Sequence, residues 1–272
     1  MGNSVKRVLF VNSEIFPYLP ETEIANIGRY LPQGIQERKK EIRSFMPRYG
    51  CINERKNQLH EVIRLSGMNI IINDVDRPLV IKVASISAAR MQVYFIDNED
   101  YFHRKSIYHD ADGNFFKDNG ERAIFFARGV LETVKKLRWA PDVIHCQGWI
   151  SQILPIYLKK AYVDDPIFSQ SKVVLSLYDD MPVTDFPEDF KDRVLFGAVG
   201  EKEVEILKEP TGINLAKLAI DYSDGVILGS ENIENELITY CKEAGLPVLP
   251  YNAESIKDGS YIEDYNSFYD NL

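Results

Sequence analysis

Short apolar runs alternate with amphipathic segments along most of this chain. The runs that predict buried strands span 7–12, 41–46, 91–97, 142–146, 172–177 and 225–230. Between the first two runs, apolar residues recur at helical spacing and predict a helix over 24–37. The inner face of this helix is expected to hold Ile24, Ile27, Leu31 and Ile35. Strands that are apolar throughout and alternate with helices are typical of a parallel sheet covered on both faces, so we predict an α/β fold.

A hairpin and several further helices complete the predicted order of elements. Segments 68–74 and 79–86 favour two strands that are joined by a turn at 75–78. A polar, proline-containing stretch over 179–192 predicts a loop. Helices are predicted over 121–138, 150–160, 199–208, 212–222 and 231–242, the last with Ser230 as its cap.

The C-terminal segment 255–272 predicts a tail helix. Its aromatic and apolar residues at helical spacing are Tyr261, Tyr265, Phe268 and Leu272. One interpretation is that this stripe docks on the rest of the protein, and the other is that it forms a surface for a partner. Because the sequence shows no internal repeat and no low-complexity linker, residues 1–272 are predicted to form one domain.

Net charge and cysteine usage narrow the class of protein. The 272 residues carry a formal net charge of -9, which repels phosphate backbones and argues against nucleic acid as a partner. We recognise no signal peptide and no long apolar span, so we expect a cytoplasmic protein without a membrane partner. Cys51, Cys146 and Cys241 are too scattered for a disulfide framework or a zinc site, and Cys146 is expected in the core.

Generic motifs add little chemistry. The sequence has no glycine-rich dinucleotide loop after a strand, no Walker loop, no serine nucleophile elbow and no His-Glu-x-x-His zinc motif. The stretch HDADGN (109–114) contains oxygen ligands but lacks the spacing of a calcium-binding loop, so it is interpreted as an exposed turn. We therefore expect no metal site and no cofactor, and we assign no catalytic residue.

Six stretches, taken in order, resemble the ADP-glucose-type starch and glycogen synthase family. They are KRVLFVNSEIFPY (6–18), LPQGIQERKKEIRSFMPRYG (31–50), VYFIDNEDYFHR (93–104), DNGERAIFFARGVLE (118–132), PDVIHCQGWISQILPIYLK (141–159) and NLAKLAIDYSDGVILGS (214–230). The resemblance implies the GT-B architecture, in which two Rossmann-like domains face each other across a cleft. This chain then corresponds to the N-terminal half, a single Rossmann-like, doubly wound, mostly parallel sheet. The family transfers glucose from ADP-glucose to an α-1,4-glucan without a metal.

The first loop departs from the family pattern at the positions that would bind the diphosphate. The family carries Lys-x-Gly-Gly-Leu and then Ala-Asp, whereas this chain has Pro20 for the lysine and Thr22 and Glu23 for the two glycines. The aspartate is replaced by Asn26. Proline removes an N–H donor, and Glu21 and Glu23 place negative charge where the phosphates would lie. The resemblance therefore implies a degenerate donor loop, in which Thr22 or Glu21 begins the following helix.

Two further family landmarks keep their place but lose polar members. His-x-His-Asp-Trp reads HCQGW at 145–149, and Thr-x-His-Asn reads SLYD at 176–179. Aromatic and polar side chains around these motifs suit sugar binding by stacking and hydrogen bonds, although each could instead serve packing. The candidate glucan or cleft contacts are Tyr101, Phe102, Arg104, His145, Gln147, Trp149, Tyr178 and Asp179. Lys217 matches a family lysine but fits an exposed helix position equally well.

These observations leave three functions open, with ADP-glucose and an α-glucan as the ligands that the resemblance implies. The first is a glycogen or starch synthase-like protein that is incomplete or inactive alone, because the Lys-x-Gly-Gly loop is lost and the chain ends near where the family's C-terminal domain begins. A separate C-terminal-type domain or a homo-oligomer could complete the cleft, and whether the chain is an enzyme stays open. The second is a non-catalytic module that binds α-glucan and regulates glycogen metabolism. The third is an interaction subunit whose exposed face binds a partner.

Overall fold

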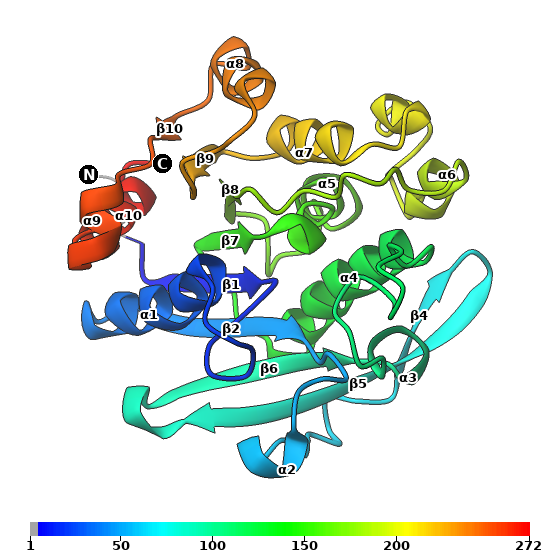
Figure 1. Ribbon diagram of the computed structural model, residues 1–272, viewed down its shortest axis with the longest axis horizontal. Coiled ribbons are helices and arrows are strands. Elements are labelled where there is room, and N and C mark those ends of the chain that lie inside the picture. Colours follow the sequence, from blue (N-terminus) through cyan, green and yellow to red (C-terminus); the bar gives the residue numbers. More distant parts are fainter. Residues whose placement is uncertain (1–4) are drawn as a thin grey trace.

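A ten-stranded sheet forms the centre of the computed structural model, which describes residues 5–272 (Figure 1). The strands are β1 (Arg7–Asn12), β2 (Glu41–Pro47), β3 (His60–Glu61), β4 (Met68–Ile72), β5 (Val75–Ile86), β6 (Met91–Asp97), β7 (Val143–Gln147), β8 (Lys172–Leu177), β9 (Gly225–Leu228) and β10 (Val248–Leu249). The α-helices are α1 (Glu23–Glu37), α2 (Glu54–Asn57), α3 (Glu99–Phe102), α4 (Asn119–Leu137), α5 (Leu154–Ile156), α6 (Phe190–Val194), α7 (Gly212–Asp221), α8 (Asn235–Glu243), α9 (Ala253–Asp258) and α10 (Tyr261–Asp270). Tighter or wider helical turns are η1 (Ser87–Ala89), η2 (Trp149–Ser151), η3 (Tyr157–Ala161) and η4 (Glu205–Lys208).

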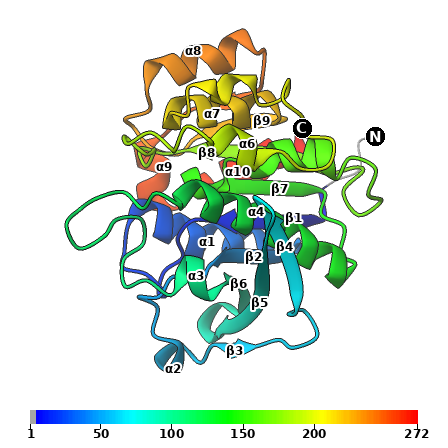
Figure 2. The ribbon, with the colours of Figure 1, turned by 90° about the vertical axis from the view of Figure 1, so that its right-hand side faces the viewer.

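The sequence order of the strands across the sheet reverses at the middle of the sheet. Strands β10, β9, β8, β7, β1, β2 and β6 lie side by side in that order and run parallel. Strand β5 joins antiparallel to β6 and carries β3 and β4 at the outer edge. In Figure 2, the strands from β8 to β5 follow one another in this order from top to bottom. The predicted doubly wound, mostly parallel sheet is therefore confirmed, and its order reverses between β1 and β7.

Helices cover both faces of the sheet, as the apolar strands predict. Leu9 and Val11 of β1 belong to a core that includes residues of α4, α5 and α7. Val8 and Phe10, which point the other way, belong to a core shared with α1 and α10. Because both faces of β1 are buried, the open surface that remains for a ligand lies at the ends of the strands.

The first helix begins and packs as its sequence pattern predicts. Thr22 is its N-cap, since the side-chain oxygen accepts a hydrogen bond from the N–H of Ala25 at 3.0 Å. Glu23 lies in the first turn, where the helix dipole favours an acid. The buried face of the helix holds Ile27, Leu31 and Ile35. This packing fixes Thr22 and Glu23 at the carboxyl edge of the sheet.

The predicted hairpin is present, but the predicted position of its turn is wrong. The chain reverses at Asn73 and Asp74, whose φ angles are 50° and 58°, and residues 75–78 already belong to β5. Asn and Asp tolerate this left-handed conformation better than most residues, so the two-residue Asn-Asp turn is favoured over one at Asp76 and Arg77. Pro78 remains within the strand opposite Asn69.

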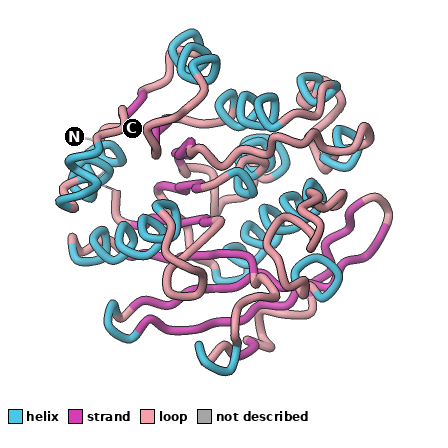
Figure 3. The backbone as a smooth tube through the Cα atoms, in the orientation of Figure 1, coloured by secondary structure: helices cyan, strands magenta, loops and turns pink. Residues whose placement is uncertain are grey.

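Several predicted helices differ in extent from those in the structure (Figure 3). The segment 150–160 divides into η2, α5 and η3, with a proline at the start of α5. Only η4 is helical within the predicted helix 199–208, and α6 begins within the stretch 179–192 that predicts a loop. Ser230 does not cap a helix, because α8 begins later, and its side chain instead accepts the N–H of Asp179 at 2.9 Å.

The C-terminal segment docks on the sheet, which confirms the first interpretation of its aromatic stripe. It forms two helices, and Gly259 at φ 83° ends α9 before α10 begins, so the prediction of one helix is wrong. The buried stripe of α10 is Tyr261, Tyr265 and Tyr269, whereas Phe268 is only partly buried. Ion pairs of Arg38 with Glu263 and of Lys40 with Asp270 also fasten α10 to the end of α1 and the start of β2.

Cys146 is buried in β7, which confirms its predicted core position. Among residues 5–272, no helix has the length and apolar character needed to cross a membrane.

Candidate functional site

The carboxyl edge of the sheet contains a groove beside the first loop. This edge groove, with a volume of about 350 Å³, lies between the start of α1 and the residues that follow β8, β9 and β10. Its lining includes Thr22, Glu23, Tyr178, Asp179, Glu231 and Tyr251. Ligands of doubly wound sheets bind at this edge, beyond the carboxyl ends of the strands. The edge groove is therefore the candidate site.

The edge groove is acidic. Glu23, Asp179 and Glu231 contribute carboxylates, and no lysine or arginine is among the described residues that line it. Burial raises the pKa of Glu23, and a hydrogen bond with Tyr251 opposes this shift. A groove with this composition repels a diphosphate and offers hydrogen-bond acceptors to a neutral ligand.

Thr22 accepts hydrogen bonds from two amides in the first turn of α1. A helix start binds phosphate through unpaired N–H groups and the positive end of its dipole. Here the side chain of Thr22 accepts the N–H of Ala25, and its backbone oxygen accepts the N–H of Asn26 at 2.9 Å. The Thr22 hydroxyl also donates to Oε2 of Glu14 at 2.7 Å, and burial raises the pKa of this carboxyl. The loop therefore adds the carboxyl of Glu14 beside Thr22, and Glu23 stands where the family pattern has glycine.

Gly148 lies close to the side chain of Ser13 where β1 and β7 end. Gly148, directly after β7, has a φ of 83°, and a Cβ at this position would lie 2.1 Å from Oγ of Ser13. The backbone N–H of Trp149 donates to Oδ2 of Asp180 at 2.8 Å. Burial raises the pKa of Asp180 to about 7, since little water reaches its charged form. The glycine that replaces the family's aspartate thus lets the ends of the two strands pack tightly.

His145 is a structural residue rather than an exposed contact. Its Nε2 lies 2.7 Å from Oγ of Ser176, and its Nδ1 lies 2.7 Å from the hydroxyl of Tyr269. The ring is fully buried, and burial lowers the pKa of His145 to about 3. A neutral imidazole that is hydrogen-bonded on both nitrogens cannot reach a sugar, so the structure does not support the predicted contact.

Most other predicted contacts also lie away from the edge groove, because they fill the core or form ion pairs. Tyr101, Phe102 and Trp149 are buried. Gln147 is buried as well and accepts a hydrogen bond from the hydroxyl of Tyr178 at 3.2 Å.

The two predicted basic residues form ion pairs. Arg104 pairs with Asp118, and its guanidinium lies 4.5 Å from the centre of the Phe116 ring. Lys217 pairs with Glu236 on the helix surface. These arrangements favour the packing interpretation of each residue.

The structure brings four of the predicted residues together in the edge groove. They are Thr22, Glu23, Tyr178 and Asp179. Pro20 is exposed, and Asn26 lines a separate groove between α1 and the C-terminal helices. Sequence reasoning missed Glu231, Asn232 and Tyr251, which share the groove. Their positions in the sequence could have indicated them, because each lies within a few residues after a strand whose carboxyl end faces this edge.

Known proteins with similar sequences support the same family. Residues 7–249 match the starch synthase catalytic domain family. A glycogen synthase from Chlorobium limicola is 39% identical over 173 residues, which cover 63% of this chain and 35% of that protein. A glycogen synthase from Chlorobium chlorochromatii is 30% identical over 269 residues, which cover 93% of this chain and 55% of that protein. The chain thus spans between 35% and 55% of the length of these two relatives.

A solved structure shows the same fold. The catalytic domain of starch synthase IV from Arabidopsis thaliana, bound to ADP and acarbose, superposes with a TM-score of 0.68 at 14% sequence identity. The superposition covers 93% of this chain and 52% of that chain. The family match over residues 7–249 confirms the resemblance of the six stretches, and this chain belongs to the starch synthase catalytic domain family.

Proposed function

We propose that this chain is a starch synthase-type domain that binds a neutral α-glucan in the edge groove and does not transfer glucose from ADP-glucose by itself. The observation that carries the proposal is the acidic edge groove beside a helix start whose cap, Thr22, accepts the N–H of Ala25 and donates to the carboxylate of Glu14. The related glycogen synthases by name act on glycogen, a neutral polymer of glucose. A neutral ligand is compatible with the groove's charge, whereas a sugar nucleotide is not.

Carboxylates and tyrosine rings suit a glucan for distinct physical reasons. Sugar hydroxyls donate hydrogen bonds, and the carboxylates of Glu23, Asp179 and Glu231 only accept when ionised. Asn232 adds an amide that can both donate and accept. Tyr251 is only partly buried, so part of its ring is open to the apolar face of a sugar.

The same carboxylates oppose a diphosphate. Two like charges about 4 Å apart repel by ~1 kcal/mol in water and by ~4 kcal/mol near a protein surface. Transfer from a sugar nucleotide depends on stabilising the negative charge of the departing diphosphate, which requires positive groups or free amides. The lining residues of the edge groove provide three acids and no basic side chain. We therefore infer that the first-loop substitutions remove donor binding while they leave the fold intact.

Electrophoresis through a native gel that contains glycogen tests this function. The parent chain is expected to migrate more slowly than in a gel without glycogen. The variant Asp179→Ala/Tyr251→Ala is expected to lose this retardation, because both side chains lie in the edge groove. Asp221→Ala/Tyr240→Ala is a matched control, since this hydrogen-bonded pair joins α7 to α8. Equal migration of the parent in both gels, or full retardation of Asp179→Ala/Tyr251→Ala, would contradict the proposal.

A separate C-terminal-type domain or a second copy of this chain stays a predicted partner. The position of the edge groove, at the open ends of the strands, supports a partner that covers it. Light scattering after gel filtration tests the second copy, because a monomer of this chain has a mass of 31.2 kDa.

A further inference from the structure

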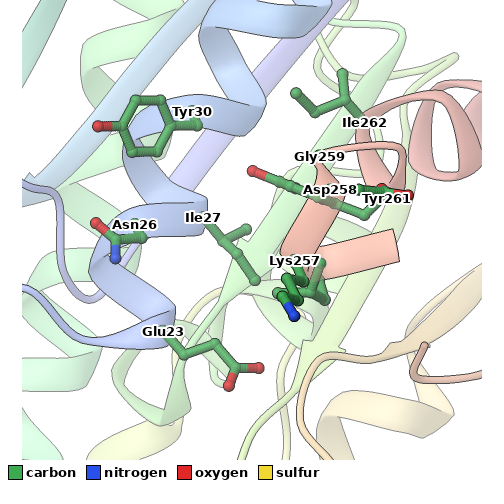
Figure 4. A pocket seen from close by; sticks show the side chains of 10 residues that line it. Glu23, Asn26, Ile27, Tyr30, Lys257, Asp258, Gly259, Tyr261 and Ile262 are labelled. Atoms are coloured by element: carbon green, nitrogen blue, oxygen red, sulfur yellow. The ribbon is translucent and has the colours of Figure 1, made fainter. Parts of the chain in front are cut away.

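A second groove lies between α1 and the C-terminal helices. This helix groove, with a volume of about 450 Å³, is built by one face of α1 and by the turn that joins α9 to α10 (Figure 4). In the figure, Ile27 of α1 points toward the wall that carries Tyr261 and Ile262, whereas the ring of Tyr30 extends away from that wall at the edge of the opening. The residues from α9 and α10 lie beyond residue 249, where the family match ends. The helix groove is thus formed in part by a segment outside the shared family region.

The floor and one wall of the helix groove are apolar. Ile27 and Tyr261 are buried beneath it, while Tyr30 is 47% exposed and presents its ring to solvent. The guanidinium of Arg29 lies 5.2 Å from the centre of the Tyr30 ring and donates to Gln33 at 2.6 Å. An exposed aromatic ring at the edge of an apolar floor provides a surface on which the flat C–H face of a sugar can stack.

The rim of the helix groove carries both signs of charge. Glu23, Asn26, Lys257 and Asp258 surround the apolar floor. The two carboxylates accept hydrogen bonds, the ammonium of Lys257 donates them, and the amide of Asn26 can do either. Several sugar hydroxyls require such a mixture of donors and acceptors. Two carboxylates against one ammonium leave the rim slightly negative, so the groove favours an uncharged polyhydroxylated ligand over a phosphorylated one.

The two grooves share a wall. Glu23, the first residue of α1, lines both the edge groove and the helix groove. Each groove alone is near the lower end of the 300–1,000 Å³ range of small-molecule sites, so each holds a short piece of a chain-like ligand. The shared residue Glu23 therefore places the two grooves next to each other at the start of α1.

We propose that the helix groove is a second α-glucan subsite, contiguous with the edge groove through Glu23. This inference rests on the proposed function and assigns Tyr30 as the stacking residue of the second subsite. One glucan chain that occupies both grooves gains contacts in each without a second loss of translational freedom. A long maltooligosaccharide therefore binds more tightly than one that fills a single groove.

Titration calorimetry with maltoheptaose on the parent, Tyr30→Ala, Tyr30→Phe and Asp179→Ala/Tyr251→Ala tests the inference. Tyr30→Ala is expected to weaken binding by about 3- to 10-fold, the range expected for loss of one aromatic contact. Tyr30→Phe keeps the ring and is expected to bind within about 2-fold of the parent. Because Tyr30 is exposed, neither change is expected to lower the thermal unfolding temperature, and this is checked on the same samples.

The outcomes separate the two proposals. One outcome is that the parent binds maltoheptaose, that Asp179→Ala/Tyr251→Ala abolishes this binding, and that Tyr30→Ala leaves it unchanged. In that case the proposed function stands and the second subsite is wrong. If the parent binds no maltoheptaose, both proposals fail. ADP serves as the second probe, and saturable binding of ADP that Tyr30→Ala removes would show a nucleotide site instead and overturn the inference.

Discussion

The hydroxyl of Tyr269 lies 2.7 Å from Nδ1 of His145, although the two residues are 124 positions apart in the sequence. His145 opens the second family landmark on β7, and Tyr269 belongs to the last turns of α10. The contact therefore joins the C-terminal helix to the interior of the sheet. It gives the landmark histidine a structural role, in which burial and two hydroxyl partners keep the ring neutral.

Removal of this hydroxyl is expected to destabilise the fold. Tyr269→Phe leaves a ring nitrogen of His145 buried without its partner, which costs about 1–3 kcal/mol. Urea unfolding followed by circular dichroism measures the loss. Tyr265→Phe, one turn earlier on the same buried face, is the control because its hydroxyl makes no hydrogen bond within residues 5–272, and it is expected to cost less. Equal costs for the two variants would argue against the contact.

The buried histidine predicts a loss of stability in acid. The unfolded chain binds a proton on His145 below its ordinary pKa of 6.5, whereas the folded pKa is about 3. The contribution of His145 is therefore fully present above pH 6.5 and is lost as the pH falls toward 3. The expected slope is up to about 1.4 kcal/mol for each pH unit in this window. His145→Gln should reduce this slope in urea unfolding, and an unchanged slope would contradict a neutral buried imidazole.

Asp180 predicts the opposite dependence on pH. Its ordinary pKa is 3.8, and burial raises the folded pKa to about 7, so the folded state holds a proton that the unfolded state has lost. Its contribution is present below pH 3.8 and is lost as the pH rises through 7. Glu14, Asp179 and the N–H of Trp149 are the charged or polar groups that face it.

The conservative variant Asp180→Asn isolates this effect. It keeps an oxygen for the Trp149 amide and removes the titration, so its stability relative to the parent should increase between pH 5 and pH 8. Urea unfolding at four pH values provides the comparison. A stability difference that stays constant across this range would show that Asp180 does not carry a raised pKa.

The close approach at Gly148 predicts a severe effect of one added methyl group. Gly148→Ala places a Cβ 2.1 Å from Oγ of Ser13 and 3.0 Å from Oδ2 of Asp180, at a φ that disfavours side chains. We expect a loss of at least about 2 kcal/mol in the free energy of unfolding. Gly245→Ala is the matched control, because Gly245 also has a positive φ of 68° but an open space around it. Similar losses for both variants would contradict the tight crevice.

Much of the fold could be predicted from the sequence because the sheet is buried on both faces. The apolar runs that became β1, β2, β6, β7 and β8 leave few alternatives to central parallel strands. The turn of the hairpin was misplaced because Pro78 suggested a break, whereas Asn73 and Asp74 provided the left-handed conformation that a tight turn needs. The irregular path from Pro182 to Lys208 depends on tertiary contacts that no local pattern encodes.

The candidate site was harder to predict than the fold. The first-loop substitutions at Thr22 and Glu23 were visible because a family pattern existed for comparison. His145, Gln147 and Trp149 match landmarks as well, but a landmark does not reveal whether its side chain faces the solvent or the core. Tyr251 joins the edge groove only through the parallel pairing of β10 with β9, which the sequence pattern did not indicate.

Titration calorimetry with ADP-glucose tests the central claim, that the acidic edge groove and the substituted loop before α1 exclude the diphosphate of a sugar nucleotide. We predict no saturable heat for ADP-glucose up to a few millimolar, a level that corresponds to binding weaker than about -4 kcal/mol. The variant Glu23→Gln/Asp179→Asn/Glu231→Gln, which removes the three charges, should bind more tightly than the parent. Binding of ADP-glucose to the parent with a Kd well below 1 mM would contradict the account.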